Sequence, residues 1–131
     1  MRKILIYLLL VLFLIISVGC QSEGRKFQDI DPKTAYERLQ HEKNIILLDV
    51  RTLEEYNEKH IPQSILIPVD VLKEQAEELL EDKEAPIFVY CRSGNRSAKA
   101  AEILVELGYK KVYNLGGINS WQYNTESNSP K

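Results

Sequence analysis

A cysteine ends a run of strand-forming residues, and small and basic residues follow it closely. Cys91 follows residues 86–90 (PIFVY), residues 92–97 read RSGNRS, and a helical pattern then covers residues 98–107. A thiol in a turn at a helix N-terminus meets inward-pointing amides and the positive end of the helix dipole. These groups, with Arg92 and Arg96, favour the thiolate and lower its pKa from about 8.5. The pattern favours a nucleophilic Cys91 over a buried structural cysteine.

Charged residues also mark the end of a second predicted strand. Residues 45–50 form a continuous apolar run, as expected of a strand buried on both faces, and Asp49 and Arg51 lie at its end. Ligands of parallel sheets bind at the carboxyl ends of strands. Asp49, Arg51 and Cys91 therefore lie at one binding site if their two strands are close in the sheet. Asp49 and Arg51 either frame the floor of a pocket or form a structural ion pair. We prefer the ion pair.

The remaining segments alternate between strand and helix patterns. Strands are expected at residues 27–30, 64–67 and 112–115, and helices at residues 32–41, 53–60 and 69–80, with Asp31 and Thr52 as helix N-caps. Alternation with short loops predicts an α/β fold with a central, mostly parallel five-stranded sheet flanked by helices on both faces. The folded domain is expected to cover residues 28–124, and residues 125–131 to form a flexible tail.

The N-terminal segment has the parts of a secretory signal. Arg2 and Lys3 precede about 15 mostly apolar residues, too few for a membrane span of about 20. Residues 17–20 (SVGC) resemble the lipobox of bacterial lipoproteins, whose cysteine is acylated. Residues 1–19 are therefore expected to be a signal peptide and residues 20–27 a tether lipidated at Cys20. The alternatives are an uncleaved anchor or a released domain, and all three place the domain outside the cytoplasm, the preferred one on the bacterial cell membrane.

Composition excludes several function classes. The chain has 131 residues and a net charge of −2, with no basic stripe typical of nucleic-acid binding. Only Cys20 and Cys91 are cysteines, so a CxxC-type zinc site is excluded and no metal or cofactor is expected. An acylated Cys20 cannot form a disulfide with Cys91. Cys91 would then be the only free thiol of the mature chain.

Four segments in order resemble the single-domain rhodaneses, a family of sulfurtransferases. The resemblance spans about residues 28–124 and implies a parallel sheet with flanking helices and a cysteine that carries sulfur as a persulfide. It rests on residues 49–56 (DVRTLEEY), 60–68 (HIPQSILIP), 90–97 (YCRSGNRS) and 108–117 (GYKKVYNLGG), followed by Trp121.

The resemblance also implies roles for single residues. Cys91 would take sulfur from thiosulfate or a related donor and pass it to cyanide, a small thiol or a protein thiol. We expect Arg96 to contact the anionic substrate and Arg92 to point outward, with contact as its second role. His60 is expected to fix the turn at residues 61–62 rather than to act in catalysis, and Trp121 to lie in the core rather than under the substrate. The substrate-binding residues would be Arg92, Ser93, Gly94, Asn95, Arg96 and Ser97.

Two other functions use the same loop. Cysteine-dependent phosphatases of the tyrosine-phosphatase type, and arsenate reductases, also hold a thiolate in an amide nest. The tyrosine-phosphatase loop has five residues between Cys and Arg, whereas four separate Cys91 from Arg96 here. The other alternative is a non-catalytic surface-anchored module that holds a persulfide or polysulfide for a partner.

Overall fold

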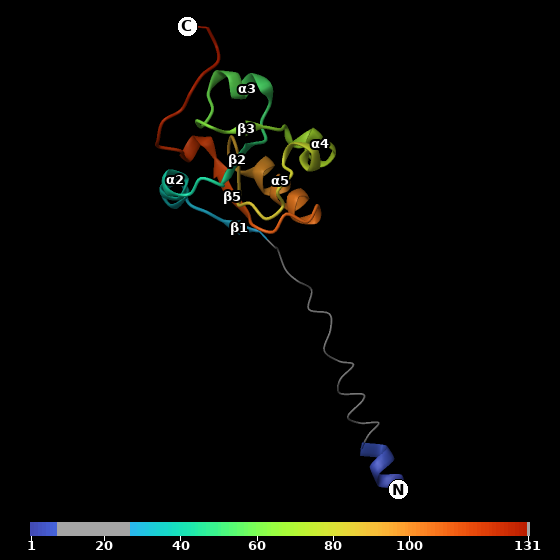
Figure 1. Cartoon of the computed structure of the whole chain (residues 1–131). Helices are drawn as coiled ribbons and strands as arrows, with labels where there is room; N and C mark the ends of the chain where they lie inside the picture. Colours follow the sequence, from blue (N-terminus) through green and yellow to red (C-terminus); the bar gives the residue numbers. More distant parts are fainter. Residues whose placement is uncertain (8–26, 131) are drawn as a thin grey trace.

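Five strands, all paired in parallel, form one sheet in the order β1-β5-β4-β2-β3. The computed structural model in Figure 1 describes residues 1–7 and 27–130. The α/β class and the parallel five-stranded sheet predicted from the sequence are confirmed, and every strand pair of that sheet is parallel. The strands are β1 (Gln28–Asp29), β2 (Ile46–Asp49), β3 (Ile65–Leu66), β4 (Ile87–Cys91) and β5 (Val112–Gly117).

Helices cover both faces of the sheet. The buried residues of α4 and α5 pack with one face of the central strands, whereas Ala35 of α2 packs with the other face. The short helix α3 follows β2 at the carboxyl edge of the sheet (Figure 1). The helices are α2 (Pro32–His41), α3 (Leu53–Glu58), α4 (Leu72–Leu79) and α5 (Asn95–Glu106), with 3-10 turns η1 (Val69–Val71) and η2 (Ile118–Ser120).

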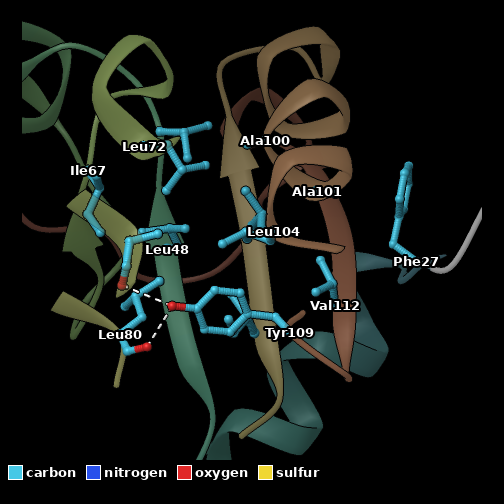
Figure 2. Close-up of a cluster of buried hydrophobic side chains, with 14 of the residues drawn as sticks. Phe27, Leu48, Ile67, Leu72, Leu80, Ala100, Ala101, Leu104, Tyr109 and Val112 are labelled. Atoms are coloured by element: carbon cyan, nitrogen blue, oxygen red, sulfur yellow. Dashed lines mark hydrogen bonds between the residues drawn. The ribbon is translucent and has the colours of Figure 1, made fainter. Parts of the chain in front are cut away.

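The larger hydrophobic cluster lies between the sheet and helices α4 and α5 (Figure 2). Leu48, Leu72 and Leu104 have no exposed surface there. The hydroxyl of Tyr109 lies 2.9 Å from the carbonyl oxygen of Ala76 and 2.7 Å from that of Leu80, so it joins the end of α4 to the connection between α5 and β5. Cys91 belongs to this cluster, so the residue that carries the thiol is anchored in the larger hydrophobic core.

Local signals in the sequence explain where the helices begin. Asp31 caps α2 by accepting a hydrogen bond from the amide of Thr34 at 3.0 Å. Thr52 and Glu55 form a reciprocal capping box at the start of α3. Both N-caps were predicted from the sequence and are confirmed.

Several element boundaries differ from the predictions, and three of the differences have a clear structural description. The helix expected at residues 69–80 starts with η1, and Leu79 near its end has 52% of its surface exposed. The helix after the cysteine begins at Asn95 instead of residue 98, because Gly94 takes the left-handed conformation that lets the chain turn directly into α5. Strand β5 runs on through Gly117, two residues beyond the strand predicted at residues 112–115.

Residues of the segment predicted as a flexible tail make backbone contacts with the rest of the domain. His60 and Glu126 form an antiparallel bridge. The carbonyl oxygen of Asn57 accepts hydrogen bonds from the amides of Asn128 at 2.8 Å and Ser129 at 3.1 Å. Backbone donors of the polar tail thus find an acceptor at the end of α3, which its composition did not reveal.

The N-terminal predictions concern residues outside the described part of the chain. Cys20, the lipobox resemblance and most of the expected signal peptide fall within residues 8–26. Residues 2–7 are helical. Among residues 1–7 and 27–130, no helix has the length and apolar character to cross a membrane.

Candidate active site

Strands β2 and β4 end side by side and bring the two predicted groups of residues to one edge of the sheet. Asp49 pairs with Tyr90 in the parallel register, and Cys91 is the last residue of β4. Asp49, Arg51 and Cys91 therefore lie at the same carboxyl edge, as the sequence indicated. At this edge β4 is flanked by β2 and β5, the position where parallel sheets bind ligands.

The loop after Cys91 folds back over the thiol. The amide of Gly94 donates a hydrogen bond to Cys91 Sγ at 3.0 Å, and Ser97 Oγ lies 3.5 Å from the sulfur. Gly94 has φ 109°, a conformation that side chains disfavour, so glycine is required for this turn. Ser93 and Asn95 are exposed on the rim of the loop, and Ser97 is fully buried.

The loop lowers the pKa of Cys91. Burial of the thiol raises the pKa, because Cys91 is only 1% exposed. Hydrogen bonds from the hydroxyl and amide of Ser97 and from the amides of Gly94 and Ser93 lower it by more. The thiolate is therefore favoured by neutral donors at the start of α5, as expected for an activated cysteine.

Gly117 allows the loop to pack against β5. A Cβ at this position would lie 2.4 Å from the carbonyl oxygen of Arg92 and 2.8 Å from the Cα of Ser93. The amide of Asn119 donates to the same Arg92 carbonyl at 3.3 Å. The sequence predicted the strand to end at residue 115, whereas the structure shows a close contact at Gly117 that positions the cysteine loop.

Arg96, expected to contact the substrate, is held by a carboxylate. Its guanidinium donates two hydrogen bonds to Glu55 of α3, at 2.8 and 2.9 Å. The hydrogen bonds from Arg96 lower the pKa of Glu55 to about 2. Arg92 extends from the rim and is exposed, as predicted. Substrate contact by either arginine stays a prediction. A substrate anion that binds Arg96 would compete with Glu55 for its guanidinium.

Asp49 and Arg51 form the buried ion pair that we preferred from the sequence. Arg51 is 4% exposed and Asp49 has no exposed surface. The guanidinium donates to Asp49 Oδ2 at 2.7 Å and to the carbonyl oxygen of Lys59 at 2.6 Å. This pair fixes the segment after α3 to the end of β2, which gives it a structural role beside the cysteine loop.

His60 does not fix the turn at residues 61–62. Its Nδ1 lies 2.8 Å from the carbonyl oxygen of Tyr56, and its ring stacks on the Tyr56 ring at 3.9 Å. The turn is held instead by Tyr90. Its hydroxyl accepts a hydrogen bond from the Ile61 amide at 3.1 Å and donates one to Ser64 Oγ. A buried tyrosine hydroxyl needs such partners, and here they come from the residues that precede β3.

Trp121 packs beside the second hydrophobic cluster, on the α2 face of the sheet. Its ring lies 5.0 Å from that of Tyr123 and 6.1 Å from that of Tyr36, with edge-on geometry. These rings line a cavity of about 370 Å³ to which no residue of the cysteine loop contributes. The core position preferred for Trp121 therefore matches its packing better than a substrate platform.

Sequence reasoning missed two residues that shape the site. Glu55 appeared only within the motif at residues 49–56, although it pairs with Arg96 across 41 positions. Tyr90 was noted only as a strand residue, although its hydroxyl links β4 to the turn before β3. The capping-box spacing of Thr52 and Glu55 was a visible signal, but nothing local indicated the partner on α5.

Fold and site together define a class of protein: a parallel α/β domain with one amide-held cysteine where its central strand turns into a helix. The family model of the rhodanese-like domain matches residues 31–124, and the chain belongs to this family. This confirms the resemblance drawn from the four sequence motifs.

Relatives and solved structures agree with the family. The chain is 37% identical over 97 residues to the thiosulfate sulfurtransferase GlpE of Coxiella burnetii, covering 73% of this chain and 88% of that protein. It is 37% identical over 91 residues to the putative sulfur carrier protein YrkF of Bacillus subtilis, covering 69% of this chain and only 48% of that protein. A solved structure described as rhodanese with anions from E. coli is 35% identical with a TM-score of 0.60, covering 63% of this chain and 98% of that one.

Proposed function

We propose that this protein is a sulfurtransferase that moves a sulfane sulfur from thiosulfate or a related donor to cyanide or a thiol. A persulfide on Cys91 would be the intermediate. The observation that supports this proposal most strongly is the hydrogen bond from the Gly94 amide to Cys91 Sγ at 3.0 Å. It belongs to a loop that lowers the pKa of the thiol. The similarity to a thiosulfate sulfurtransferase supports the same chemistry.

The first half-reaction forms the persulfide. The Cys91 thiolate attacks the outer sulfur of thiosulfate, the donor S–S bond breaks, and sulfite leaves with its electron pair. The new outer sulfur carries negative charge into the ring of amides at the start of α5. Those amides are fixed by the contact with Gly117, so they need no rearrangement to stabilise the charge.

The second half-reaction releases the sulfur. A nucleophilic acceptor attacks the outer sulfur, the persulfide S–S bond breaks, and the Cys91 thiolate is restored as leaving group. Cyanide would yield thiocyanate, and a thiol would yield a new persulfide. A low thiol pKa helps this step, because a more acidic thiol is a better leaving group.

Intact-mass spectrometry tests the proposal directly. After thiosulfate treatment we expect the protein to gain the mass of one sulfur atom and to lose it when cyanide is added. The Cys91→Ser variant, which keeps the loop but lacks the nucleophile, is the control and should gain nothing. A wild-type mass that is unchanged after thiosulfate, inorganic polysulfide and an organic persulfide would exclude the proposal.

A sulfur-carrier role is the second candidate, favoured by two observations. One relative is named a putative sulfur carrier protein, and Cys91 has only 1% of its surface exposed. A carrier would form the same persulfide but transfer it to cyanide or small thiols no faster than background. Release of phosphate from an aryl phosphate without persulfide formation would instead support the phosphatase alternative.

We also propose that the domain acts outside the cytoplasm, anchored to the cell membrane through a lipid on Cys20. The basic start, the apolar segment and the resemblance of residues 17–20 to a lipobox support this. Metabolic labelling of the full chain with a fatty acid should mark the wild type but not Cys20→Ala. Label on both proteins, or on neither, would contradict lipidation at Cys20.

A further inference from the structure

A small cavity adjoins the cysteine loop on the side of Arg92. It has a volume of about 150 Å³ and lies between the C-terminal part of α3 and η2. The register of the sheet pairs Cys91 with Gly117, and the Asn119 amide is bonded to the Arg92 carbonyl. The wall formed by η2 is thus attached to the peptide that follows the nucleophile.

The charged groups around this cavity fall into two sets. Arg51 is occupied by Asp49 and by the Lys59 carbonyl, and Glu55 is occupied by Arg96 and the capping box. These groups cannot bind a ligand without breaking well-formed contacts.

Three other charged side chains on the cavity wall have no such contacts. Glu58, Lys59 and Arg92 are exposed, and their side chains make no hydrogen bond or ion pair within residues 1–7 and 27–130. The unpaired groups are thus two cations and one anion beside the reactive loop. A thiosulfate dianion would meet the Glu58 carboxylate, whereas a zwitterion complements both signs of charge.

We propose that this cavity is the acceptor subsite and that it takes a small zwitterionic thiol of the free-cysteine type. Lys59 and Arg92 would bind the carboxylate and Glu58 the ammonium group. The volume suits a single amino acid, while a tripeptide would extend beyond the walls. The inference rests on the proposed transfer of sulfur by Cys91.

The transfer step balances without a further reactant. The acceptor thiolate attacks the outer sulfur of the Cys91 persulfide, one S–S bond forms, and the S–S bond to Cys91 breaks. The electron pair of the broken bond stays on Cys91 as thiolate. The proton of the acceptor thiol ends on the outer sulfur of the new small-molecule persulfide, and no net oxidation occurs.

An acceptor series measures the contribution of each charge. Protein loaded with persulfide, verified by mass, is mixed with cysteine, N-acetylcysteine, cysteine methyl ester or 2-mercaptoethanol. The rate of sulfur transfer is then divided by the concentration of acceptor thiolate. The two derivatives lack the ammonium charge and the carboxylate charge respectively. Solvent-exposed ion pairs typically change equilibria by roughly two- to fivefold. We expect cysteine to exceed each derivative by that factor and 2-mercaptoethanol by about tenfold.

Variants assign the two ends of the acceptor. Glu58→Gln should remove the preference for cysteine over N-acetylcysteine, and Lys59→Gln should reduce the preference over the methyl ester. The matched control is Glu54→Gln, an exposed glutamate on the same helix that does not line the cavity. It should keep both preferences.

A second measurement does not depend on sulfur chemistry. Serine, the oxygen analogue of cysteine, should shift the amide NMR signals of Lys59, Arg92 and Asn119 in the unloaded protein, and Glu58→Gln should weaken the serine affinity measured from these shifts by roughly two- to fivefold. Equal rates for all four thiols, or preferences that survive in Glu58→Gln and Lys59→Gln, would exclude the acceptor subsite. Neither result would contradict the proposed Cys91 persulfide. Failure to load any sulfur would instead remove the proposed function itself.

Discussion

Strands β2 and β4 run side by side and end at the same edge, yet they stabilise negative charge in opposite ways. At the end of β2, the carboxylate of Asp49 is buried beneath a full guanidinium, with Arg51 Nη2 2.7 Å from Oδ2. At the end of β4, the Cys91 sulfur is buried among neutral donors, chiefly the Ser97 hydroxyl and the loop amides. One anion is permanent and structural, and the other must form and disappear during a reaction.

This difference explains why the arginine of the cysteine loop is not in contact with the sulfur. A fixed cation beside the thiolate would oppose the attack on the donor, because negative charge moves away from the Cys91 sulfur in that step. Glu55 instead neutralises Arg96, and backbone dipoles supply the field at the sulfur. Neutral amides can hold a thiolate and then a persulfide at similar cost, because both carry one negative charge.

The largest effect is expected from removing the cation at the end of β2. Arg51→Met leaves Asp49 buried without a guanidinium and also removes the bond to the Lys59 carbonyl. Loss of one partner of a buried pair typically costs about 3–5 kcal/mol. Urea unfolding at neutral pH measures this loss.

A double variant sharpens the test. Adding Asp49→Asn removes the buried charge, so the double variant should be more stable than Arg51→Met alone. If Arg51→Met lowers the free energy of unfolding by less than about 1 kcal/mol, the Asp49 carboxylate is not isolated from solvent by the fold. That result would contradict the contrast between the two strand ends.

The next effect is expected where the loop of β4 rests on β5. In Gly117→Ala, the new Cβ would meet the Arg92 carbonyl oxygen at 2.4 Å, so the loop has to shift. Overpacking of this kind costs about 1–3 kcal/mol. The displaced amides should also let the pKa of Cys91 rise, as measured by the pH dependence of its alkylation rate.

Gly116→Ala is the matched control for the loop contact. Gly116 has φ 88°, and a Cβ added there would meet no atom within 4 Å, so only backbone strain is expected. The stability of this variant should fall while the pKa of Cys91 stays the same. An equal rise of the thiol pKa in both variants would contradict a specific role for the Gly117 contact.

The parallel α/β fold was predictable because its signals are local. Apolar runs marked β2 and β4, and Asp31 and Thr52 marked the starts of α2 and α3. The cysteine at a strand end before a helix was equally local. A resemblance in four motifs then identified the family, which the family model confirmed.

The partners of the charged side chains were not predictable in the same way. Arg96 was expected to bind the substrate because it follows Cys91 closely, yet its partner Glu55 lies 41 positions earlier. The hydrogen bond from Ser127 in the C-terminal tail to Asn57 spans 70 positions. Such contacts depend on which elements the sheet order brings together, and residue spacing within one segment does not encode that.

Glu55 connects the two strand ends, and its removal is expected to have an intermediate effect. Glu55→Gln keeps the capping function of residue 55, because glutamine also serves in a capping box, but loses the ion pair with Arg96. Hydrogen bonds to charged groups contribute about 1.5–3 kcal/mol, and we expect the lower end of this range or less because both side chains are partly exposed. The Glu54→Gln variant, which alters an exposed neighbour, is the control and should change stability little.

The pH dependence of the Glu55→Gln effect has a defined sign. Because the folded-state pKa of Glu55 is lowered from 4.5 to about 2, its stabilising contribution is present above pH 4.5 and is lost as the pH falls toward 2. The stability difference between wild type and Glu55→Gln should therefore shrink through this window in urea titrations. A difference that stays constant from neutral pH to acid would show that the ion pair is not its source.

The smallest change concerns the hydroxyl of Ser97, which lies 3.0 Å from the Gly94 carbonyl oxygen and 3.5 Å from Cys91 Sγ. A hydroxyl has one proton, so it can donate to the carbonyl while the thiol is neutral and turn to the sulfur when the thiolate forms. Ser97→Ala removes this switch and should raise the pKa of Cys91, so persulfide formation slows below that pKa and recovers at higher pH. Ser93→Ala, whose hydroxyl has no hydrogen bond within the described residues, should leave the profile unchanged. An unshifted profile in Ser97→Ala would mean that the amides alone hold the thiolate, and the contrast with Asp49 would then be one of backbone against side chain.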